Sequence, residues 1–507
     1  MAKEVSFEEK LWKSAIKLRG GVETAEYKHV VLSLIFLKYV NDRFDKQLDK
    51  IEKEFGKEYI DIPEFYIKDN AFYIPETSRW SYIMENAKQN DIAIKIDTAL
   101  HDIELNNEGL KGALPNNYYS RLEIDHAKLA SLLDVINTIK IKDEEEDGIG
   151  RIYEYFLGQF AGKEGKGKGE FYTPKSVVKL IVELIEPYDG KIYDPCCGSG
   201  GMFVQSMKFI KQHEGNSKNV SIYGQEAIAT TRKLAMMNLA IRGISYNMGE
   251  KNADTFLNDL HKDLKADYIM ANPPFNLKDW REKNQLIDDY RWSGYEVPPT
   301  SNANYAWILH MVSKLSENGI AGFILSNGAL NSGGVEYNIR KNLIKNDLIE
   351  SIMVLPRKLF YATDISVSLW VINKNKKEKA SFRDRTNEIL FLDLRQMGAP
   401  FDKKYVQLTQ EDRDKVTSTI NTWRTNINTY EDIPEYCHAS NLNEIKEKNY
   451  NLVPSRYIDF VDRVESLNFD EKMEELKNEF IELYKQEKDS KNKLLKLFEE
   501  LGHEIKL

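Results

Sequence analysis

The stretch IYDPCCGSGGMF, residues 192–203, decides the fold of this chain. Its apolar first part has the pattern of a strand that ends at Asp194, and Gly198, Gly200 and Gly201 then lead into a helical pattern. Glycines let the backbone approach a ligand closely, and a helix N-terminus favours an anionic group. Because the spacing is neither G-x-G-x-x-G nor a Walker loop, a phosphate site is disfavoured. By itself this turn fits a ligand site or plain tight packing.

Short apolar segments alternate with helical patterns from about residue 176 onward. This alternation predicts an α/β fold, a Rossmann-like and mostly parallel sheet with crossover helices. In such a sheet ligands bind beyond the carboxyl ends of the strands. The strands that we expect are GKIYDP (190–195), NVSIYGQE (219–226), ADYIMANPPF (266–275), GIAGFILSNGAL (319–330), LIESIMVLP (348–356) and SVSLWVINKNK (366–376).

Two further acids follow the predicted strand that ends at Asp194. Glu226 ends the second strand about thirty residues later, near the place of the acid that binds the ribose diol in Rossmann folds. Asp254, in NADTF (252–256), can accept a hydrogen bond from an adenine amino group. Each alone has an ordinary alternative, a solvated carboxylate for Glu226 and a helix N-cap for Asp254. Together with the glycine turn they predict a pocket for an adenosine with an amino-acid tail, which suits S-adenosylmethionine better than a dinucleotide.

The stretch NPPF, from Asn272 to Phe275, ends the next predicted strand. Pro273 and Pro274 stiffen the backbone between the amide and the aromatic ring. An exocyclic amine is a poor nucleophile, because its lone pair is delocalised into the ring. The Asn272 side-chain oxygen and the Pro273 carbonyl can each accept one N–H of the amine, and Phe275 can stack on a base turned out of the duplex. This predicts amino-group methylation by positioning, without a metal.

The chain resembles the modification subunits of type I restriction–modification systems, which are N6-adenine DNA methyltransferases. The resemblance covers nearly the whole length and includes GEFYTP (169–174), DPCCGSGGMF, GQE, NADTF, NPPF and the segment 289–311. It implies catalytic roles for Asn272, Pro273, Pro274 and Phe275. The cofactor-binding residues that it implies are Glu170, Phe171, Tyr172, Thr173, Pro174, Lys175, Asp194, Ser199, Gly200, Gly201, Glu226, Asp254 and Asn272.

The same resemblance implies a DNA-modifying assembly. Its partners are double-stranded DNA, a specificity subunit that receives two modification subunits, and a separate restriction subunit for cleavage. Neither helicase nor nuclease motifs occur in this sequence, so cleavage belongs to another chain. No stretch of a hundred or more residues is left for a target-recognition domain, and we therefore expect sequence reading to come from the specificity subunit.

The resemblance and the patterns divide the chain into three parts. We expect a helical N-terminal domain (1–150), the S-adenosylmethionine-dependent methyltransferase domain (151–410) and a C-terminal region (411–507) that ends in a long amphipathic helix for subunit assembly. Glu487 and Ser490 interrupt the apolar seam of this helix. The alternative is that the seam folds back on the protein's own core. The apolar residues at its a and d positions are Met473, Leu476, Phe480, Leu483, Leu494, Leu497 and Leu501.

Composition sets further limits on this chain of 507 residues. Hydrophobic residues make up 42% and charged residues 30%, which is ordinary for globular domains. The net charge of −9 does not indicate nucleic acid binding, so a DNA contact requires a local basic surface or a partner. We see no membrane-spanning run or signal peptide and expect a cytoplasmic protein. Cys196, Cys197 and Cys437 fit neither a disulfide framework nor a zinc site, and adjacent Cys196 and Cys197 suit packing better than redox chemistry.

Three alternatives to the type I modification subunit stay open. The first is a self-sufficient adenine DNA methyltransferase that reads DNA through 276–303 and the N-terminal domain. The second is a catalytically inactive assembly protein with this fold, against which the intact NPPF stretch and Glu226 argue. The third is an RNA or protein amino methyltransferase. An assay of methyl transfer to DNA, RNA and protein separates these three from one another.

Overall fold

The structure is a computed structural model that divides into two units, residues 1–458 and 459–507. In the described residues no helix is long and apolar enough to cross a membrane. The residues that the structure describes are 7–20, 22–67, 71–122, 124–139, 148–164, 173–360, 365–379, 381–401, 405–425, 429–461 and 469–500.

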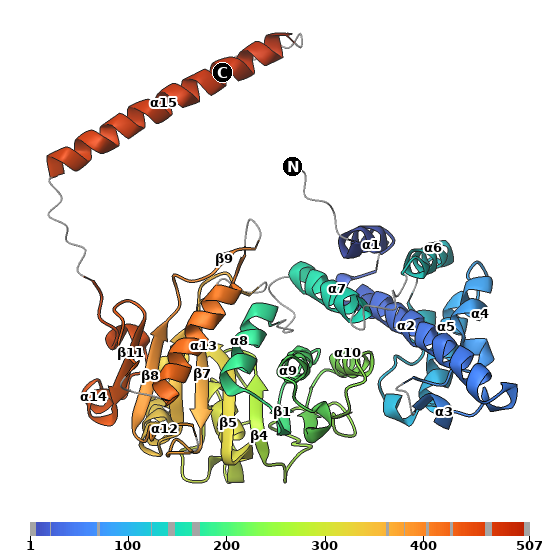
Figure 1. Ribbon diagram of the computed structural model, residues 1–507, viewed down its shortest axis with the longest axis horizontal. Coiled ribbons are helices and arrows are strands. Elements are labelled where there is room, and N and C mark those ends of the chain that lie inside the picture. Colours follow the sequence, from blue (N-terminus) through green and yellow to red (C-terminus); the bar gives the residue numbers. More distant parts are fainter. Residues whose placement is uncertain are drawn as a thin grey trace. The chain divides into compact units, whose positions relative to one another are not determined.

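A nine-stranded sheet forms the centre of the first unit, in the order β11-β8-β6-β7-β5-β4-β1-β2-β3 (Figure 1). The pairs β1–β2, β1–β4, β2–β3, β4–β5 and β6–β8 are parallel, whereas β7 runs antiparallel between β5 and β6, and β11 runs antiparallel to β8. The expected Rossmann-like, mostly parallel sheet is therefore confirmed. The strands are β1 (Gly190–Asp194), β2 (Val220–Gly224), β3 (Tyr246–Asn247), β4 (Ala266–Ala271), β5 (Leu315–Ser326), β6 (Ile349–Val354), β7 (Val367–Asn373), β8 (Glu388–Asp393) and β11 (Cys437–Asn441). A separate small pair consists of β9 (Ala399–Pro400) and β10 (Val406–Gln407).

The central strands are buried because helices cover the sheet. All seven residues of β7 and all six of β6 are buried, which explains why apolar residues predominate in both strands instead of alternating with polar ones. One such helix, α8, has a strongly one-sided apolar pattern, and its Ile181 and Ile185 lie close to Gly322 of β5. The helices of this part are α8 (Lys175–Ile185), α9 (Gly201–Gln212), α10 (Ala229–Ala240), α11 (Asn304–Lys314), α12 (Gly334–Lys345), α13 (Gln410–Thr425) and α14 (Leu442–Glu447).

In the residues that the structure describes, the regular elements of the N-terminal part of the first unit are helices, as the sequence predicts. The long helix α2 is buried on every side between Tyr27 and Asn41, so neighbouring elements enclose this part of the helix. Trp12 of α1 packs edge-on against Phe156 and Phe160 of α7, with ring centroids 5.3 and 4.7 Å away. The helices are α1 (Phe7–Lys17), α2 (Thr24–Glu54), α3 (Glu64–Ile67), α4 (Trp80–Glu85), α5 (Ile92–Leu105), α6 (His126–Asn137) and α7 (Gly148–Glu164).

The N-terminal helices pack directly on the sheet domain. Tyr39 of α2 donates a hydrogen bond to the Ile241 carbonyl just after α10, and Lys233 of α10 donates to the Leu114 carbonyl. These contacts explain why residues 1–458 form one unit. Short 3-10 helices complete it: η1 (Lys57–Tyr59), η2 (Glu76–Ser78), η3 (Glu108–Leu110), η4 (Tyr119–Arg121), η5 (Ser217–Asn219), η6 (Tyr290–Trp292), η7 (Asn327–Leu330) and η9 (Pro454–Arg456).

The second unit contains one continuous helix, α15 (Phe469–Glu500) (Figure 1). The six predicted seam residues within it are half or more exposed, from 50% for Met473 and Leu476 to 69% for Phe480. The seventh, Leu501, lies outside the described residues. The boundary between the two compact units lies at residue 458, so α13 and β11 belong to the first unit together with the sheet. The divisions at 150 and 410 that we expect from the sequence stay predictions.

Candidate active site

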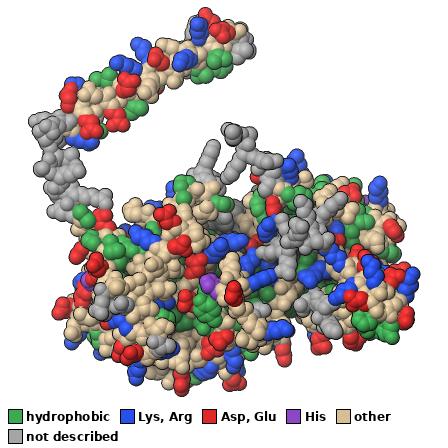
Figure 2. All heavy atoms as spheres, in the orientation of Figure 1, with side chains coloured by type: hydrophobic (Ala, Val, Ile, Leu, Met, Phe, Trp, Pro, Cys, Tyr) green, Lys and Arg blue, Asp and Glu red, His purple; other side chains and the backbone are tan. Residues whose placement is uncertain are grey.

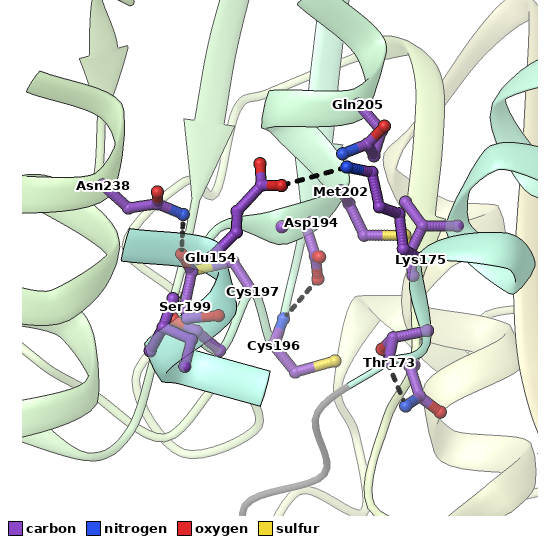
Figure 3. Close-up of a pocket in the computed structure, with 15 residues that line it drawn as sticks. Glu154, Thr173, Lys175, Asp194, Cys196, Cys197, Ser199, Met202, Gln205 and Asn238 are labelled. Atoms are coloured by element: carbon purple, nitrogen blue, oxygen red, sulfur yellow. Dashed lines mark hydrogen bonds and ion pairs between the residues drawn. The ribbon is translucent and has the colours of Figure 1, made fainter. Parts of the chain in front are cut away.

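Three strand ends meet at one edge of the sheet. Because β1 pairs in parallel with both β2 and β4, the residues that follow these strands lie side by side. Backbone hydrogen bonds join the first two ends, from Gln225 N to Asp194 O and from Cys197 N to Gln225 O, each 3.0 Å long. A pocket opens here (Figure 3). Its lining is Glu154, Leu157, Thr173, Lys175, Val178, Asp194, Cys196, Cys197, Gly198, Ser199, Gly201, Met202, Gln205, Asn238 and Asn272.

The glycine turn has the backbone conformation that its sequence requires. Gly198 and Gly200 have φ angles of 54° and 75°, in the left-handed region where a side chain is strained. Gly198 N donates to Glu226 Oε2 (3.0 Å), and Cys196 N donates to Asp194 Oδ1 (3.0 Å). The two predicted acids therefore hold the turn that separates β1 from α9.

Asp194 is only 2% exposed, although it lines the pocket. The pKa of this carboxyl group is raised from 3.8 to about 7; burial is the main cause, the hydrogen bond from the Cys196 N–H opposes the shift, and the nearby charge of Glu226 adds to it. Burial and the charge of Asp194 also raise the pKa of the Cys196 and Cys197 thiols well above the ordinary value. Thiols of this kind are poor nucleophiles, which agrees with a packing role.

The loop with Asp254 is fixed from both sides. Gln225, fully buried, donates from Nε2 to the Asn258 carbonyl (2.8 Å) and accepts from Leu260 N (3.1 Å). Arg291 donates to the Thr255 and Phe256 carbonyls at 3.0 and 2.7 Å. Arg291 belongs to the segment 289–311 singled out in the sequence, so one task of that segment is to support this loop.

Asp254 itself is exposed, and Ala253 N donates to the Glu226 carbonyl (3.0 Å), which places the loop beside Glu226. Asp254 Oδ1 accepts from Phe256 N and Leu257 N at 2.8 and 2.9 Å, as in a cap. Its Oδ2 makes no hydrogen bond within the part of the chain that the structure describes. The capping alternative thus accounts for one carboxylate oxygen and leaves the other available for a ligand.

Asn272 follows β4 directly. Its Nδ2 donates to Thr173 Oγ1 (3.0 Å), the hydrogen bond drawn at Thr173 in Figure 3. Its Oδ1 is buried and has no hydrogen-bond partner among the described residues. A buried acceptor without a partner costs about 1–3 kcal/mol, so its presence calls for a functional explanation.

Asn276 bends the chain just after the NPPF stretch. It has a φ of 53°, in the left-handed region that asparagine tolerates better than most residues. Buried Asn304 accepts from Asn276 N (3.0 Å) and donates to Asn276 Oδ1 (2.9 Å), and Ser326 Oγ donates to the same oxygen (2.8 Å). Phe275 is half-buried and lies edge-on to Phe360, with ring centroids 6.2 Å apart. The NPPF stretch is therefore held at its start by the hydrogen bond from Asn272 to Thr173 and just after its end by the contacts of Asn276.

The pocket brings together six of the predicted cofactor residues. They are Thr173, Lys175, Asp194, Ser199, Gly201 and Asn272. Pro174, Gly200, Glu226 and Asp254 are not among its lining residues; Pro174 is the N-cap of α8, and Glu226 is bonded to the turn. Glu170, Phe171 and Tyr172 lie outside the described residues.

Glu154 is the lining residue that sequence reasoning missed most clearly. It lies on α7, and its carboxylate pairs with Arg242 (3.0 Å), Lys175 (3.2 Å) and Lys208 (3.4 Å); Figure 3 shows the pair with Lys175. Asn238 of α10, also missed, donates to the Ser199 carbonyl (2.7 Å). No spacing rule links these positions to the glycine turn, since they come from separate helices.

Comparison with known proteins identifies the class to which this fold and site belong. The methyltransferase subunit of a type I restriction–modification system from Streptococcus thermophilus superposes with a TM-score of 0.77 at 24% identity, over 90% of this chain and 99% of that one. Family models for N-6 DNA Methylase and for the HsdM N-terminal domain match residues 144–466 and 7–139.

Sequence relatives narrow the class further. The methylase subunit of the type I restriction enzyme HindI from Haemophilus influenzae is 41% identical over 80% of this chain and 94% of the relative. The MjaIX methylase subunit from Methanocaldococcus jannaschii is 35% identical over 98% of this chain and 91% of the relative. The chain belongs to the N-6 DNA methylase family and, within it, to the methylase subunits of type I restriction enzymes. It is thus an adenine-specific DNA methyltransferase, the modification subunit of such a system.

Proposed function

We propose that the chain transfers a methyl group from S-adenosylmethionine to N6 of an adenine turned out of double-stranded DNA, in the cytoplasm, with Asn272 as the central catalytic residue. The observation that carries this proposal is the buried Asn272 Oδ1 without a partner. Because Nδ2 is engaged by Thr173, the amide presents an acceptor, and an amine substrate supplies the missing donor.

Asn272 and its neighbours act on the substrate amine by positioning. Asn272 Oδ1 and the Pro273 carbonyl each accept one N–H, which draws the nitrogen toward tetrahedral geometry and frees its lone pair. The stiff Pro273–Pro274 backbone and the Asn304 contacts hold both acceptors in place, so little reorganisation is left for the transition state. Phe275 offers its ring to the extruded base. When bound, S-adenosylmethionine supplies an electrophilic methyl group on sulfur.

The residues around the pocket fit this cofactor. The Oδ2 of Asp254 can accept from an adenine amino group, and Glu226 lies where a ribose diol binds in Rossmann folds. Ile228 and Leu257, which follow these two acids, are 42% and 50% exposed and can cover the faces of an adenine ring. At the other end of the pocket, Lys175 and Thr173 can bind the amino-acid part of the cofactor.

A groove beside this pocket can contact the DNA backbone. It shares Lys175 and Gln205 with the pocket and extends along α8, α9 and α13. Lys and Arg side chains gather near the middle of the face drawn in Figure 2. Burial, Arg413 and Lys175 lower the pKa of Lys179, which indicates crowding of positive charge. Such crowding favours a phosphate ligand. The Lys and Arg residues of the groove are Arg43, Lys175, Lys179, Lys208, Lys211 and Arg242, and its acids are Glu183, Glu186, Glu214 and Asp414.

Helix α15 supplies the contact with a specificity subunit in this proposal. Its exposed a and d positions form an apolar seam with the 3.5-residue spacing of a coiled coil. Glu487 and Ser490 interrupt the seam, and polar residues at such positions select register and partner. Two modification subunits then join one specificity subunit, which reads the DNA, and a separate restriction subunit cleaves it.

The variant Asn272→Ala tests the proposed chemistry. With the specificity subunit present, we expect methylation of unmodified DNA to fall at least about a hundredfold, because the acceptor acts as the transition state forms. Binding of S-adenosylmethionine, measured by calorimetry, should change by no more than roughly threefold, since the amide acts on the amine. Asn318→Ala, at an exposed asparagine of β5, is the matched control. Persistent activity in Asn272→Ala, or a product that is only N4-methylcytosine by mass spectrometry, contradicts the proposal.

A further inference from the structure

The amide of Asn272 is held by a residue 99 positions earlier in the chain. Thr173 Oγ1 accepts from Asn272 Nδ2 at 3.0 Å, which links the start of α8 to the end of β4. Both residues line the same pocket. Among the described residues, no other hydrogen bond to the Asn272 side chain occurs.

The backbone on each side of this hydrogen bond is rigid. Pro174, the N-cap of α8, is buried, has a φ of −57°, and its carbonyl accepts from Val177 N and Val178 N. Threonine is stiff about χ1 because it is branched at Cβ, so its hydroxyl direction follows the backbone. On the other side, Pro273 restricts the conformation of Asn272. The hydroxyl therefore meets the amide at a defined place.

An amide has one accepting and one donating end, and only the accepting end suits an amine substrate. If the Asn272 amide were rotated by 180°, its NH₂ group would face the N–H groups of the target and two donors would be buried together. A hydroxyl accepts and donates at once, so Thr173 can hold Nδ2 and still give its own proton to another acceptor in the pocket. In the structure the Thr173 oxygen accepts from Nδ2, so Oδ1 is the end of the amide that remains available as an acceptor.

We infer that Thr173 is a positioning residue for Asn272, which sets the side-chain position and orientation of the catalytic amide, in addition to any contact with the cofactor. This inference rests on the proposed function of Asn272. It assigns to Thr173 an effect on the methyl-transfer step itself, whereas a residue that only binds cofactor affects the apparent affinity for S-adenosylmethionine.

The variants Thr173→Val and Thr173→Ser separate these roles. Valine keeps the branched shape and removes the hydroxyl, whereas serine keeps the hydroxyl. At saturating S-adenosylmethionine, with the specificity subunit and unmodified DNA, we expect kcat to fall about tenfold in Thr173→Val, the effect of one hydrogen bond. Thr173→Ser should stay within roughly threefold of the parent. Calorimetry with S-adenosylhomocysteine measures any contact of Thr173 with the cofactor separately, because kcat at saturating S-adenosylmethionine does not depend on that contact. Thr419→Val, at a hydroxyl of α13, controls for loss of a hydroxyl elsewhere.

A double variant tests whether Thr173 acts through Asn272. In the Asn272→Ala background, Thr173→Val should leave the residual rate unchanged, because the amide that it holds is gone. A further tenfold loss there, an unchanged kcat in Thr173→Val, or a loss confined to cofactor affinity overturns the inference. If Thr173→Val does not fold, as judged by its melting temperature, Thr173→Ala replaces it. An active Asn272→Ala protein contradicts the proposed function instead, so the two failures are distinguishable.

Discussion

Asp194 combines two properties that oppose each other in the folded protein. It is buried, which disfavours its charge, yet its carboxylate accepts the Cys196 N–H that shapes the glycine turn. The effects of burial and of the Glu226 charge are larger than the effect of this hydrogen bond, so the pKa of Asp194 is raised from 3.8 to about 7. The folded protein therefore holds a proton that the unfolded chain releases between about pH 4 and pH 7. The stabilisation that this bound proton gives to the folded protein is fully present below about pH 4. It decreases as the pH rises and is lost as the pH passes about 7.

The variant Asp194→Asn removes this dependence. Its side-chain oxygen can still accept from Cys196 N, but it carries no charge that burial can penalise. A shift of about three pKa units corresponds to a cost on the order of 4 kcal/mol above pH 7. We expect urea unfolding to show the variant more stable than the parent at pH 8 and similar to it near pH 4. Parallel stability curves for the two proteins between pH 5 and pH 8 would contradict this prediction.

The residues of the candidate site differ in how far the sequence could predict them. Asp194 and Asn272 end apolar strand patterns, so their place at the sheet edge follows from the periodicity and the parallel pairing. The hydrogen bond between Thr173 and Asn272 and the place of Glu154 depend on how separate helices dock on the sheet. That docking is a property of tertiary packing, which neither spacing nor composition encodes locally.

At the scale of elements, the six expected strands are confirmed, whereas the sequence analysis did not predict helix α13 or the strands β3, β8, β9, β10 and β11. The short strand β11, CHASN, lies at the edge of the sheet and has only two buried residues, so its sequence contains no apolar run that would predict a strand. In α13 the first residues are acidic and polar, and a few buried side chains such as Val416 and Trp423 dock it on the domain. Whether such weakly patterned segments form a strand or a helix depends on their contacts with the rest of the fold.

A buried cluster of charged side chains links α13 to the sheet by ion pairs. Glu350 of β6 has a fully buried side chain, and its carboxylate lies 2.8 Å from Arg424 of α13 and 3.3 Å from Arg385. Burial raises the pKa of Glu350, but the two guanidinium groups outweigh it and the pKa is lowered overall. A lowered pKa means that this contribution to stability is present above the ordinary pKa of glutamate and is lost on acidification.

The variant Glu350→Gln tests this link. It leaves the buried Arg424 and Arg385 without a counter-charge, and we expect the free energy of unfolding at neutral pH to fall by about 3–5 kcal/mol. The matched control is Glu388→Gln, which breaks the partly exposed pair with Arg383 (2.6 Å) and should cost about 1 kcal/mol or less. Urea denaturation measures both. An equal decrease in the free energy of unfolding in the two variants would mean that the ion pairs of Glu350 do not stabilise the contact of α13 with the sheet.

At the scale of the whole molecule, the proposed function assigns methyl transfer to the first unit, residues 1–458, and the contact with a specificity subunit to helix α15 of the second unit. Residues 1–458 contain the sheet, the pocket and the helices that enclose them. Helix α15 exposes Met473, Leu476, Phe480 and Leu483 at 50–69%. Exposed apolar area is unfavourable in water by about 25 cal/mol per Å², which drives such a seam toward a partner surface.

Deletion from Phe469 onward should therefore leave the chemistry and remove the assembly. We expect the shortened chain to melt within about 2 °C of the parent and to bind S-adenosylmethionine, because α15 belongs to the separate unit. It should no longer co-purify with a co-expressed specificity subunit. The point variant Phe480→Glu, which places a charge on the seam, should reproduce that loss, whereas Lys485→Glu, off the a and d positions, should not. A truncated chain that still co-purifies with the specificity subunit would move the docking surface to residues 1–458. Site-specific methylation by the purified full chain alone would instead favour a self-sufficient enzyme, since sequence reading would then need no partner.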